Sequence, residues 1–237
     1  IQVEDAVLEG EPNPDNLPVI ADLKSCFIYN SAEEGSEFEC SNPLFTQTHR
    51  LIERAERSNM QGVLTDCPHR EKLGWLEQDH LVGPSLFYNY DMTTLTPKII
   101  RDITDTQKTD GMVPTTAPQY VSFGNLFDDS PEWGSTLLIM PFMYYEQYGD
   151  NSIITRNYDA MRRYVDYLTG RTKDGIVSHG LGDWYDVVEG KAGFCHNTPI
   201  PLVASAHYIL DLQLLTKAAG MTGNKADVEK YSKIYDY

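Results

Sequence analysis

Residues 65–79 read Thr-Asp-Cys-Pro-His-Arg-Glu-Lys-Leu-Gly-Trp-Leu-Glu-Gln-Asp, and no other stretch of this chain is as informative. Acidic, basic and indole side chains lie close together in it, namely Asp66, Glu71, Glu77 and Asp79 with Arg70 and Trp75. Carboxyl groups transfer protons, a neighbouring cation tunes their pKa values, and an indole packs against the C–H face of a sugar ring. The stretch therefore predicts a site that cleaves carbohydrate.

The overall charge narrows the range of ligands. Among 237 residues, 19 are Lys or Arg and 35 are Asp or Glu, so the net charge is −16. Such a chain repels phosphate backbones and anionic membranes, which argues against a nucleic-acid or membrane partner. It suits a neutral ligand or a cation. The aromatic content of 11%, with 15 Tyr and 3 Trp, is rich in the residues that line carbohydrate grooves.

The four cysteines, Cys26, Cys40, Cys67 and Cys195, form no CxxC pair and show no metal-ligand spacing. We expect free, buried thiols rather than a Cys26–Cys40 disulfide, and no metal or cofactor. No apolar run is long enough to span a membrane, and no signal peptide is visible at Ile1. These features do not decide the cellular compartment of the protein, and we favour a periplasmic or secreted location over a cytoplasmic one.

The first 41 residues differ in character from the rest of the chain. Short apolar runs, at Leu17–Ile20, Cys26–Tyr29 and Phe38–Cys40, lie between Pro, Gly, Asn and acidic residues. This pattern predicts irregular chain with one or two edge strands, forming a linker or the tail of a preceding β domain. From Ser41 the period changes, and Ser41 is expected to cap a helix that begins at Asn42-Pro43 and runs to Met60.

Helical periodicity continues to the last residue. Further helices are expected at 78–89, 94–108, 132–148, 152–169, 197–219 and 225–237. Thr198-Pro199 starts the helix at 197–219, and Gly149 and Gly220 end the helices at 132–148 and 197–219. Polar loops at Thr109–Asp129 and Gly170–Phe194 separate them. Around seven helices without a clear intervening strand predict an all-α toroid or solenoid. Its loops are expected to collect on one rim and to carry the site.

The stretch at 66–71 has an ordinary structural interpretation as well. Cys67-Pro68 starts a new turn, so Asp66 would serve as a helix N-cap, and Glu71 would belong to a solvated helix start. In the functional interpretation Glu71 is a general acid, which must hold its proton near neutral pH through burial or a neighbouring carboxylate such as Asp66. A positive charge at Arg70 would favour loss of the Glu71 proton, unless Arg70 faces the substrate or another acid.

All three tryptophans lie in segments rich in glycine and acids, and none lies in the middle of a helix. Trp75 follows Gly74, Trp133 belongs to Asp128–Gly134, and Trp184 belongs to Gly180–Asp186. Core packing would explain Trp75, and helix capping would explain the acids before Trp133. The paired glycines before Asp183 indicate close backbone approach or positive φ. The common pattern favours a saccharide groove.

Other chemistries find little support in the sequence. It contains no GxSxG, no P-loop and no HExxH. Cys67 and His69 are two residues apart, and nucleophilic or metal chemistry at them would need further groups that the sequence does not identify.

The segment from Thr65 to Trp75, preceded by Arg57-Ser58-Asn59-Met60-Gln61, resembles the bacterial α-L-rhamnosidases of glycoside hydrolase family 78. The resemblance runs from about Phe38 to the end and includes Ser130–Gly134, Tyr148-Gly149-Asp150 and Gly182-Asp183-Trp184. It implies an (α/α)6 barrel catalytic domain that hydrolyses terminal α-L-rhamnose with inversion. Residues 42–237 would be the N-terminal part of that domain, and the rest of the domain would be a partner.

The resemblance also implies roles for single residues. Glu71 matches the general acid, Asp66 the acid that binds sugar hydroxyls, and Trp75 the indole that packs on the sugar. Trp133 and Trp184 match further aromatic wall residues, and Asp183 a neighbouring polar contact. Many members have a Gly-Asp pair after the tryptophan, whereas this chain has Leu76-Glu77-Gln78-Asp79, so the third acid is either Glu77 or Asp79.

The resemblance places the general base, a glutamate, beyond Tyr237. An inverting glycosidase needs two carboxyl groups, so the chain alone is expected to be inactive. The expected substrate is a rhamnose-containing oligosaccharide or glycoside. Two alternatives stay open: another α/α-barrel enzyme such as a polysaccharide lyase, against which the net charge argues, and a non-catalytic carbohydrate-binding module.

Overall fold

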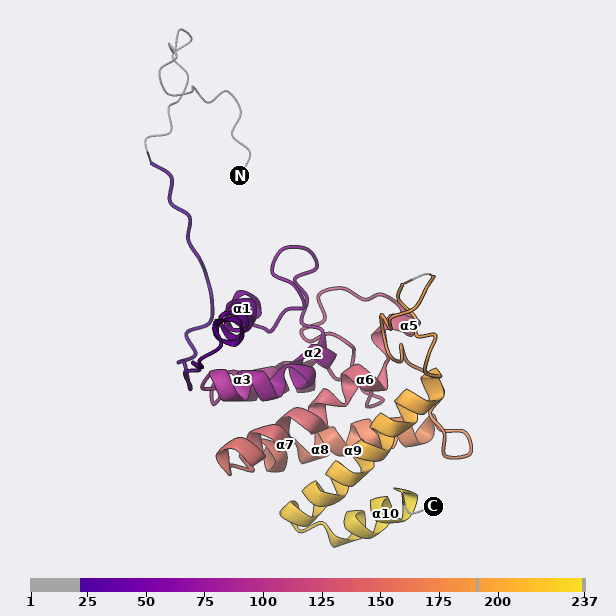
Figure 1. The fold of residues 1–237 in the computed structure, drawn as a ribbon. Coiled ribbons are helices and arrows are strands. Elements are labelled where there is room, and N and C mark those ends of the chain that lie inside the picture. Colours follow the sequence, from indigo (N-terminus) through magenta and orange to yellow (C-terminus); the bar gives the residue numbers. More distant parts are fainter. Residues whose placement is uncertain (1–21, 191, 236–237) are drawn as a thin grey trace.

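The computed structural model describes residues 22–190 and 192–235 (Figure 1). In this part the chain is helical, with isolated bridges but no strand. The helices are α1 (Pro43–Asn59), α2 (Leu76–Leu81), α3 (Gly83–Asn89), α4 (Leu95–Thr106), α5 (Asn125–Asp128), α6 (Pro131–Gly134), α7 (Thr136–Tyr148), α8 (Ser152–Gly170), α9 (Ile200–Thr222) and α10 (Lys225–Tyr235). The predicted all-α class is confirmed.

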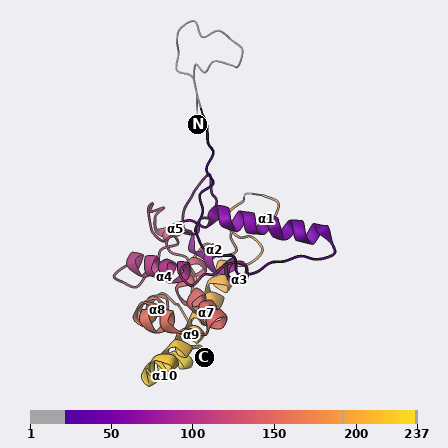
Figure 2. The same ribbon diagram turned by 90° about the vertical axis from the view of Figure 1, so that its left-hand side faces the viewer.

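Helix α1 starts one residue later than expected. Asn42, not Ser41, is the N-cap, because its side chain accepts a 3.0 Å hydrogen bond from the Leu44 N–H and Pro43 supplies the first helical residue. No residue of α1 is buried. Figure 2 shows α1 lying apart from the stack that α4, α8 and α10 form.

Two predicted helices are each divided in two. The expected helix 78–89 is α2 followed by α3, because Pro84 cannot donate a backbone hydrogen bond and a new helix starts beside it. The expected helix 132–148 is α6 followed by α7, with Ser135 between them.

Of the two predicted glycine caps, the one at the end of α7 is confirmed and the one at the end of α9 is wrong. Gly149 ends α7 in the left-handed conformation, as predicted. Helix α9 instead continues past Gly220 to end at Gly223, which has a φ of 78°. It starts at Ile200, after Pro199, and not at 197.

Residues 22–42, the described part of the segment before α1, are irregular, as expected, but two apolar runs in them are not strands. Cys26–Tyr29 and Phe38–Cys40 are exposed and pair with no strand, and among residues 22–42 only Glu34 forms a bridge, to Tyr90. The run Leu17–Ile20 lies outside the described residues. All four cysteines are free, but the expected burial is wrong: Cys26 and Cys40 are exposed, and the other two are half-buried.

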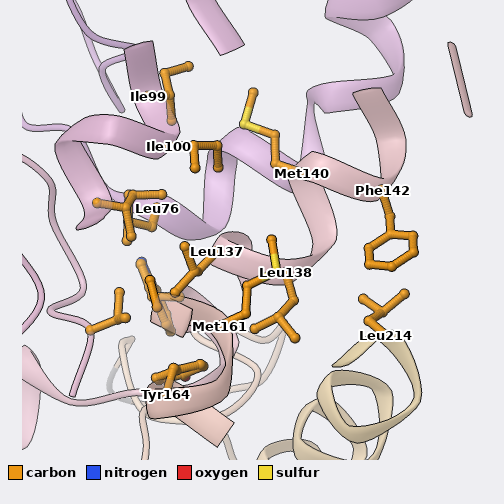
Figure 3. Close-up of a cluster of buried hydrophobic side chains, with 14 of the residues drawn as sticks. Leu76, Ile99, Ile100, Leu137, Leu138, Met140, Phe142, Met161, Tyr164 and Leu214 are labelled. Carbon is orange, nitrogen blue, oxygen red and sulfur yellow. The ribbon is translucent and has the colours of Figure 1, made fainter. Parts of the chain in front are cut away.

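The hydrophobic core is centred on α7, which is apolar around most of its circumference (Figure 3). Leu137, Leu138 and Met140 are completely buried in it, and Ile100 of α4 and Met161 of α8 pack in the same cluster. Burying each such side chain contributes about 1.5–3 kcal/mol. Helix α7 therefore anchors the scaffold from which the neighbouring loops project.

Buried polar groups connect the helices beneath these loops. The Ser135 hydroxyl donates to Asp211 Oδ2 of α9 at 2.7 Å, and the Thr136 hydroxyl donates to the Leu76 carbonyl at 2.7 Å. His80 Nδ1 lies 2.7 Å from the Thr136 hydroxyl. Burial, and then the neighbouring His207, lowers the pKa of His80 to about 4, so this ring is neutral near pH 7. These bonds hold α2 and α9 against the start of α7.

Replacing Gly134 with alanine should destabilise the protein by about 1–3 kcal/mol, because the new methyl group overpacks the core. A Cβ at Gly134 would lie 2.2 Å from the hydroxyl oxygen of Tyr164, whose side chain is buried. Gly220→Ala in α9 is the matched control, since a Cβ there meets no atom within 4 Å. Thermal unfolding should rank Gly134→Ala below the wild type and Gly220→Ala level with it or above. Equal midpoints for the two variants would contradict the close packing of α6 on α8.

The long loops gather on one side of the helical scaffold, as the sequence predicts. Figure 1 shows the segments before α2, before α5 and before α9 along its upper side. None of the described helices combines the length and the apolar character needed to cross a membrane.

Candidate active site

These loops enclose a cavity of about 720 Å³. Nine of its twelve lining residues come from just two segments, 66–78 and 181–185, and the other three from the loop and helices between them. The lining residues are Asp66, Arg70, Glu71, Trp75, Glu77, Gln78, Phe123, Phe127, Trp133, Leu181, Trp184 and Tyr185. Residues that are far apart in sequence thus meet at one site.

The segment 66–74 is a closed loop, not the start of a helix. Asp66 closes it twice, because its N–H donates to the Leu73 carbonyl at 3.1 Å and its Oδ1 accepts from the Leu73 N–H at 3.2 Å. Cys67 Sγ accepts from the Glu71 N–H at 3.2 Å. The helix-start interpretation of Asp66 and Glu71 is therefore wrong, and α2 begins only at Leu76.

Glu71 has a hydrogen-bond donor at each oxygen. Arg70 Nη2 lies 2.8 Å from Oε1, and the indole N–H of Trp75 donates to Oε2 at 2.9 Å. The Glu71 side chain is 38% exposed and Arg70 is 75% exposed. Both side chains line the cavity, so the carboxyl group is held in place while solvent and substrate can reach it.

Aromatic rings form one wall of the cavity. Trp75 stacks on Phe123, with centroids 5.3 Å apart and planes at 19°, and meets Trp133 edge-on at 6.4 Å. Phe127 meets Trp184 edge-on at 5.5 Å. All three tryptophans of the chain line this single cavity, as the groove hypothesis requires, although Trp133 is also 4% exposed and belongs to the core.

Glu77 has the most perturbed carboxyl group in the cavity wall. Burial, followed by the nearby charges of Glu132 and Asp183, raises the pKa of Glu77 to about 7. Asp183 itself is exposed and lies outside the lining residues. The Glu77 carboxyl group is therefore partly protonated near neutral pH, as titratable groups in functional sites often are.

Asp79 does not lie in the cavity. It is 3% exposed, and burial followed by the neighbouring Asp102 raises its pKa well above the usual range. Successive residues of a helix point about 100° apart, so α2 presents Glu77 and Gln78 to the cavity and turns Asp79 toward α4. Of the two candidates for the third acid, the structure places Glu77 at the site and not Asp79.

Ser130 connects α6 to the loop that carries Trp184. It precedes α6, but its hydroxyl does not cap that helix. Instead Ser130 Oγ accepts from the Leu181 N–H at 2.8 Å and donates to Glu132 Oε2. Gly180, with a φ of 133°, lies so close that a Cβ there would be 2.8 Å from Glu132 Oε2. The expected close backbone approach at the paired glycines is confirmed.

Two other acids hold the loops and do not line the cavity. Asp129 accepts from the Tyr167 hydroxyl at 2.6 Å and lies 3.3 Å from His179 Nε2. Burial opposes ionisation of Asp129, but hydrogen bonds from His179 and Tyr167 lower its pKa overall. Asp186 accepts from the backbone N–H groups of His196 and Asn197, each at 2.7 Å, which closes the loop after Trp184.

Sequence reasoning missed several residues of the site. Gln78, Phe123, Phe127 and Leu181 line the cavity, and Glu132 lies beneath it. Leu181, Tyr185 and Glu132 lie inside the segments Gly180–Asp186 and Asp128–Gly134 that the sequence singled out, but no site role was predicted for them. The phenylalanines carry no sequence signal, because a loop phenylalanine is as compatible with packing as with a binding wall. Among the described residues no group of three or more His, Cys, Asp or Glu is arranged to hold a metal ion.

Comparison with known proteins identifies one protein family and relatives that share a single name. Residues 33–236 match the profile of the bacterial alpha-L-rhamnosidase 6 hairpin glycosidase domain. An alpha-L-rhamnosidase from Formosa agariphila is 33% identical over 175 residues, which is 68% of this chain and 18% of that protein.

Solved structures agree with this match. The alpha-L-rhamnosidase from Dictyoglumus thermophilum superposes with a TM-score of 0.81 at 28% identity, covering 88% of this chain and 23% of that one. The Streptomyces avermitilis alpha-L-rhamnosidase complexed with L-rhamnose gives 0.76 at 26% identity, covering 87% and 19%. The chain thus spans about a fifth of the length of these relatives.

Proposed function

Because this chain belongs to the bacterial α-L-rhamnosidase six-hairpin glycosidase domain family, we propose that the protein containing it hydrolyses terminal α-L-rhamnosides with inversion at the anomeric carbon. The observation that carries the proposal is the single cavity in which Asp66, Glu71 and all three tryptophans meet. A sugar needs this combination of an aromatic face, hydroxyl-binding carboxylates and a proton donor.

In the proposed mechanism Glu71 is the general acid. Its proton passes to the glycosidic oxygen as the bond between that oxygen and the anomeric carbon breaks, so the aglycone leaves as a neutral alcohol. Water attacks the opposite face of the anomeric carbon, and a second carboxylate takes its proton. We place this general base outside residues 1–237, in the remainder of the catalytic domain.

Arg70 and Trp75 set the position of the acid. Their hydrogen bonds to the two oxygens of Glu71 orient the carboxyl group toward the cavity. A protonated Glu71 needs one oxygen free to donate to the glycosidic oxygen, so we place the exposed Arg70 away from Oε1 when substrate fills the cavity. Arg70 then faces the substrate, while the indole keeps its bond to Oε2.

The binding roles follow from the contacts that the protein leaves unused. Asp66 uses Oδ1 to close its own loop, which leaves Oδ2 for sugar hydroxyls. Trp75, Trp133 and Trp184 supply the apolar wall, and Asp183 adds a negative charge beside Glu77. Glu77, half neutral at pH 7, can donate as well as accept a hydrogen bond.

The alternatives receive less support. A polysaccharide lyase would act on acidic polymers, and the relatives and structures given above all carry the name alpha-L-rhamnosidase. A purely binding module has no need of a glutamate held between a cation and an indole at the mouth of the cavity.

The proposed reaction can be followed directly on the complete protein. 4-Nitrophenyl α-L-rhamnopyranoside should release nitrophenol, and NMR during the first turnovers should show β-L-rhamnose before it equilibrates to the α anomer. Initial release of α-L-rhamnose would contradict inversion. Binding of rhamnose without any hydrolysis would support the binding-module alternative.

Asp66→Asn should separate substrate binding from loop closure. The asparagine Oδ1 can still accept from the Leu73 N–H, so stability should change little. Losing the charged acceptor for sugar hydroxyls should reduce kcat/KM by about 10–100-fold, since such hydrogen bonds contribute roughly 1.5–3 kcal/mol. Asp66→Ala removes both functions and should also lower the unfolding temperature. If Asp66→Asn retained full activity, Asp66 would be a structural residue only.

A further inference from the structure

A second cavity, of about 390 Å³, adjoins the loop that carries Glu71. Residues of this loop are divided between the two cavities: Asp66, Arg70 and Glu71 line the first, whereas Thr65, Pro68 and Lys72 line the second. The loop before α5 is divided in the same way, with Phe123 lining the first cavity and Tyr120 the second. The two cavities are therefore neighbours that share two walls.

The charge of this second cavity is opposite to that of the chain. Its lining includes Lys72 and Lys98 but no acid, in a chain with 35 acidic and 19 basic residues. Lys98 is paired with Asp102 on the next turn of α4, while Lys72 forms no ion pair with any described residue. Gln61 and Tyr120 add an amide and a hydroxyl group to the lining. At least one ammonium group is thus free for a ligand.

The backbone at Lys72 is held in an unusual conformation. Its φ of 58° lies in the left-handed region, which residues other than glycine rarely adopt. The two hydrogen bonds between Asp66 and Leu73 close the loop around it and maintain this conformation. Strain of this kind persists where the surrounding structure imposes it, and it is concentrated at functional sites. Tyr185, another non-glycine residue with positive φ, lines the first cavity.

We propose that the second cavity binds an anionic group, a carboxylate or a sulfate ester, on the sugar that carries the rhamnose. This rests on the proposed function, because the acid Glu71 and the cation Lys72 are consecutive residues on the wall between the two cavities. The leaving sugar of a substrate held in the first cavity lies next to Glu71, and its substituents extend toward Lys72.

The negative charge of the whole chain does not prevent this binding. At physiological ionic strength charges more than about 8 Å apart are largely screened, so the nearest groups determine the local potential. The charged side chains that line this cavity are two lysines, one of them paired with Asp102. A neutral substrate gains nothing from them, whereas an acidic one gains a charge-assisted hydrogen bond.

The test compares substrates that differ only in charge. The complete protein is assayed on three rhamnosides of the same linkage, to glucose, to glucuronic acid and to glucose 6-sulfate. Lys72→Gln should lower the ratio of kcat/KM for charged over neutral substrate about 5-fold, through KM, as expected for one exposed ion pair. Lys98→Gln should lower the same ratio. Lys72→Arg, which keeps the positive charge that Lys72→Gln removes, should give the wild-type ratio. Lys217→Gln, at an exposed position of α9, removes the same charge and should leave the ratio unchanged.

A ratio that Lys72→Gln and Lys98→Gln both leave at the wild-type value would overturn the proposal. A change for only the glucuronide or only the sulfate identifies the anionic group. If the complete protein hydrolyses none of the three substrates, the proposed function fails, and the cavity is tested by titration with methyl β-D-glucuronide against methyl β-D-glucoside. Preferential binding of the glucuronide that Lys72→Gln abolishes would support the anion site, and equal or absent binding of the two would overturn it.

Discussion

Glu71→Gln in the complete enzyme is expected to lower kcat by about 10²–10⁴-fold on rhamnosides with poor leaving groups, which is the usual contribution of a general acid. Glutamine retains the shape of the side chain and can accept from the Trp75 indole, so the cavity should keep its structure. A 4-nitrophenyl leaving group needs little protonation, and its hydrolysis should fall far less. Steady-state kinetics on both substrate types measures this difference.

The control for this change is Glu146→Gln, at an exposed position of α7 away from the cavity. It removes one carboxylate and should leave both activities at the wild-type level. Wild-type kinetics for Glu71→Gln on the poor leaving group would exclude Glu71 as the acid. An equal loss on both leaving groups would assign it a role in binding or positioning instead.

Glu77→Gln is expected to stabilise the protein above pH 7 and to flatten the dependence of its stability on pH. The pKa of Glu77 is about 7 in the folded chain and 4.5 in the reference state. Between these values the folded state binds more protons than the unfolded state, so the free energy of unfolding falls as pH rises. The full difference corresponds to a loss on the order of 3 kcal/mol above pH 7. Glutamine does not ionise and escapes this loss.

Thermal unfolding at pH 5 and pH 8 measures the effect. The wild type should lose more stability between these values than Glu77→Gln does, whereas Glu146→Gln should retain the wild-type slope because its carboxyl group is exposed. Identical slopes for Glu77→Gln and the wild type would show that Glu77 is ionised without penalty in the folded protein.

Much of the secondary structure could be predicted because its causes are local. Helical periodicity and the left-handed Gly149 cap identified the end of α7 and both ends of α8 closely, since these depend on residues within a few positions. The errors in the predicted helix boundaries also have local causes, namely the choice of capping residue and the effect of a proline. Asn42 takes the capping position expected of Ser41, and Pro84 divides a helix that periodicity alone reads as continuous.

The site could be predicted in part for a different reason. The chemistry of Asp66, Glu71 and Trp75 is unusual at this spacing, and a Trp next to Gly and acids is uncommon in a core, so these residues stood out individually. Their convergence in one cavity matched the expectation because the loops on one side of the scaffold face each other.

The sequence by itself determined the helical class, the family and the part of the site made by Asp66, Glu71 and the three tryptophans. Only the tertiary structure decided which acids reach the cavity. Asp79 is buried against α4 while Glu77 faces the cavity, because the packing of α2 sets its rotation. Likewise Ser130 binds Leu181 across the fold instead of capping α6. Such contacts join residues far apart in sequence, and the physical reason they escape prediction is that each depends on the positions of two elements at once.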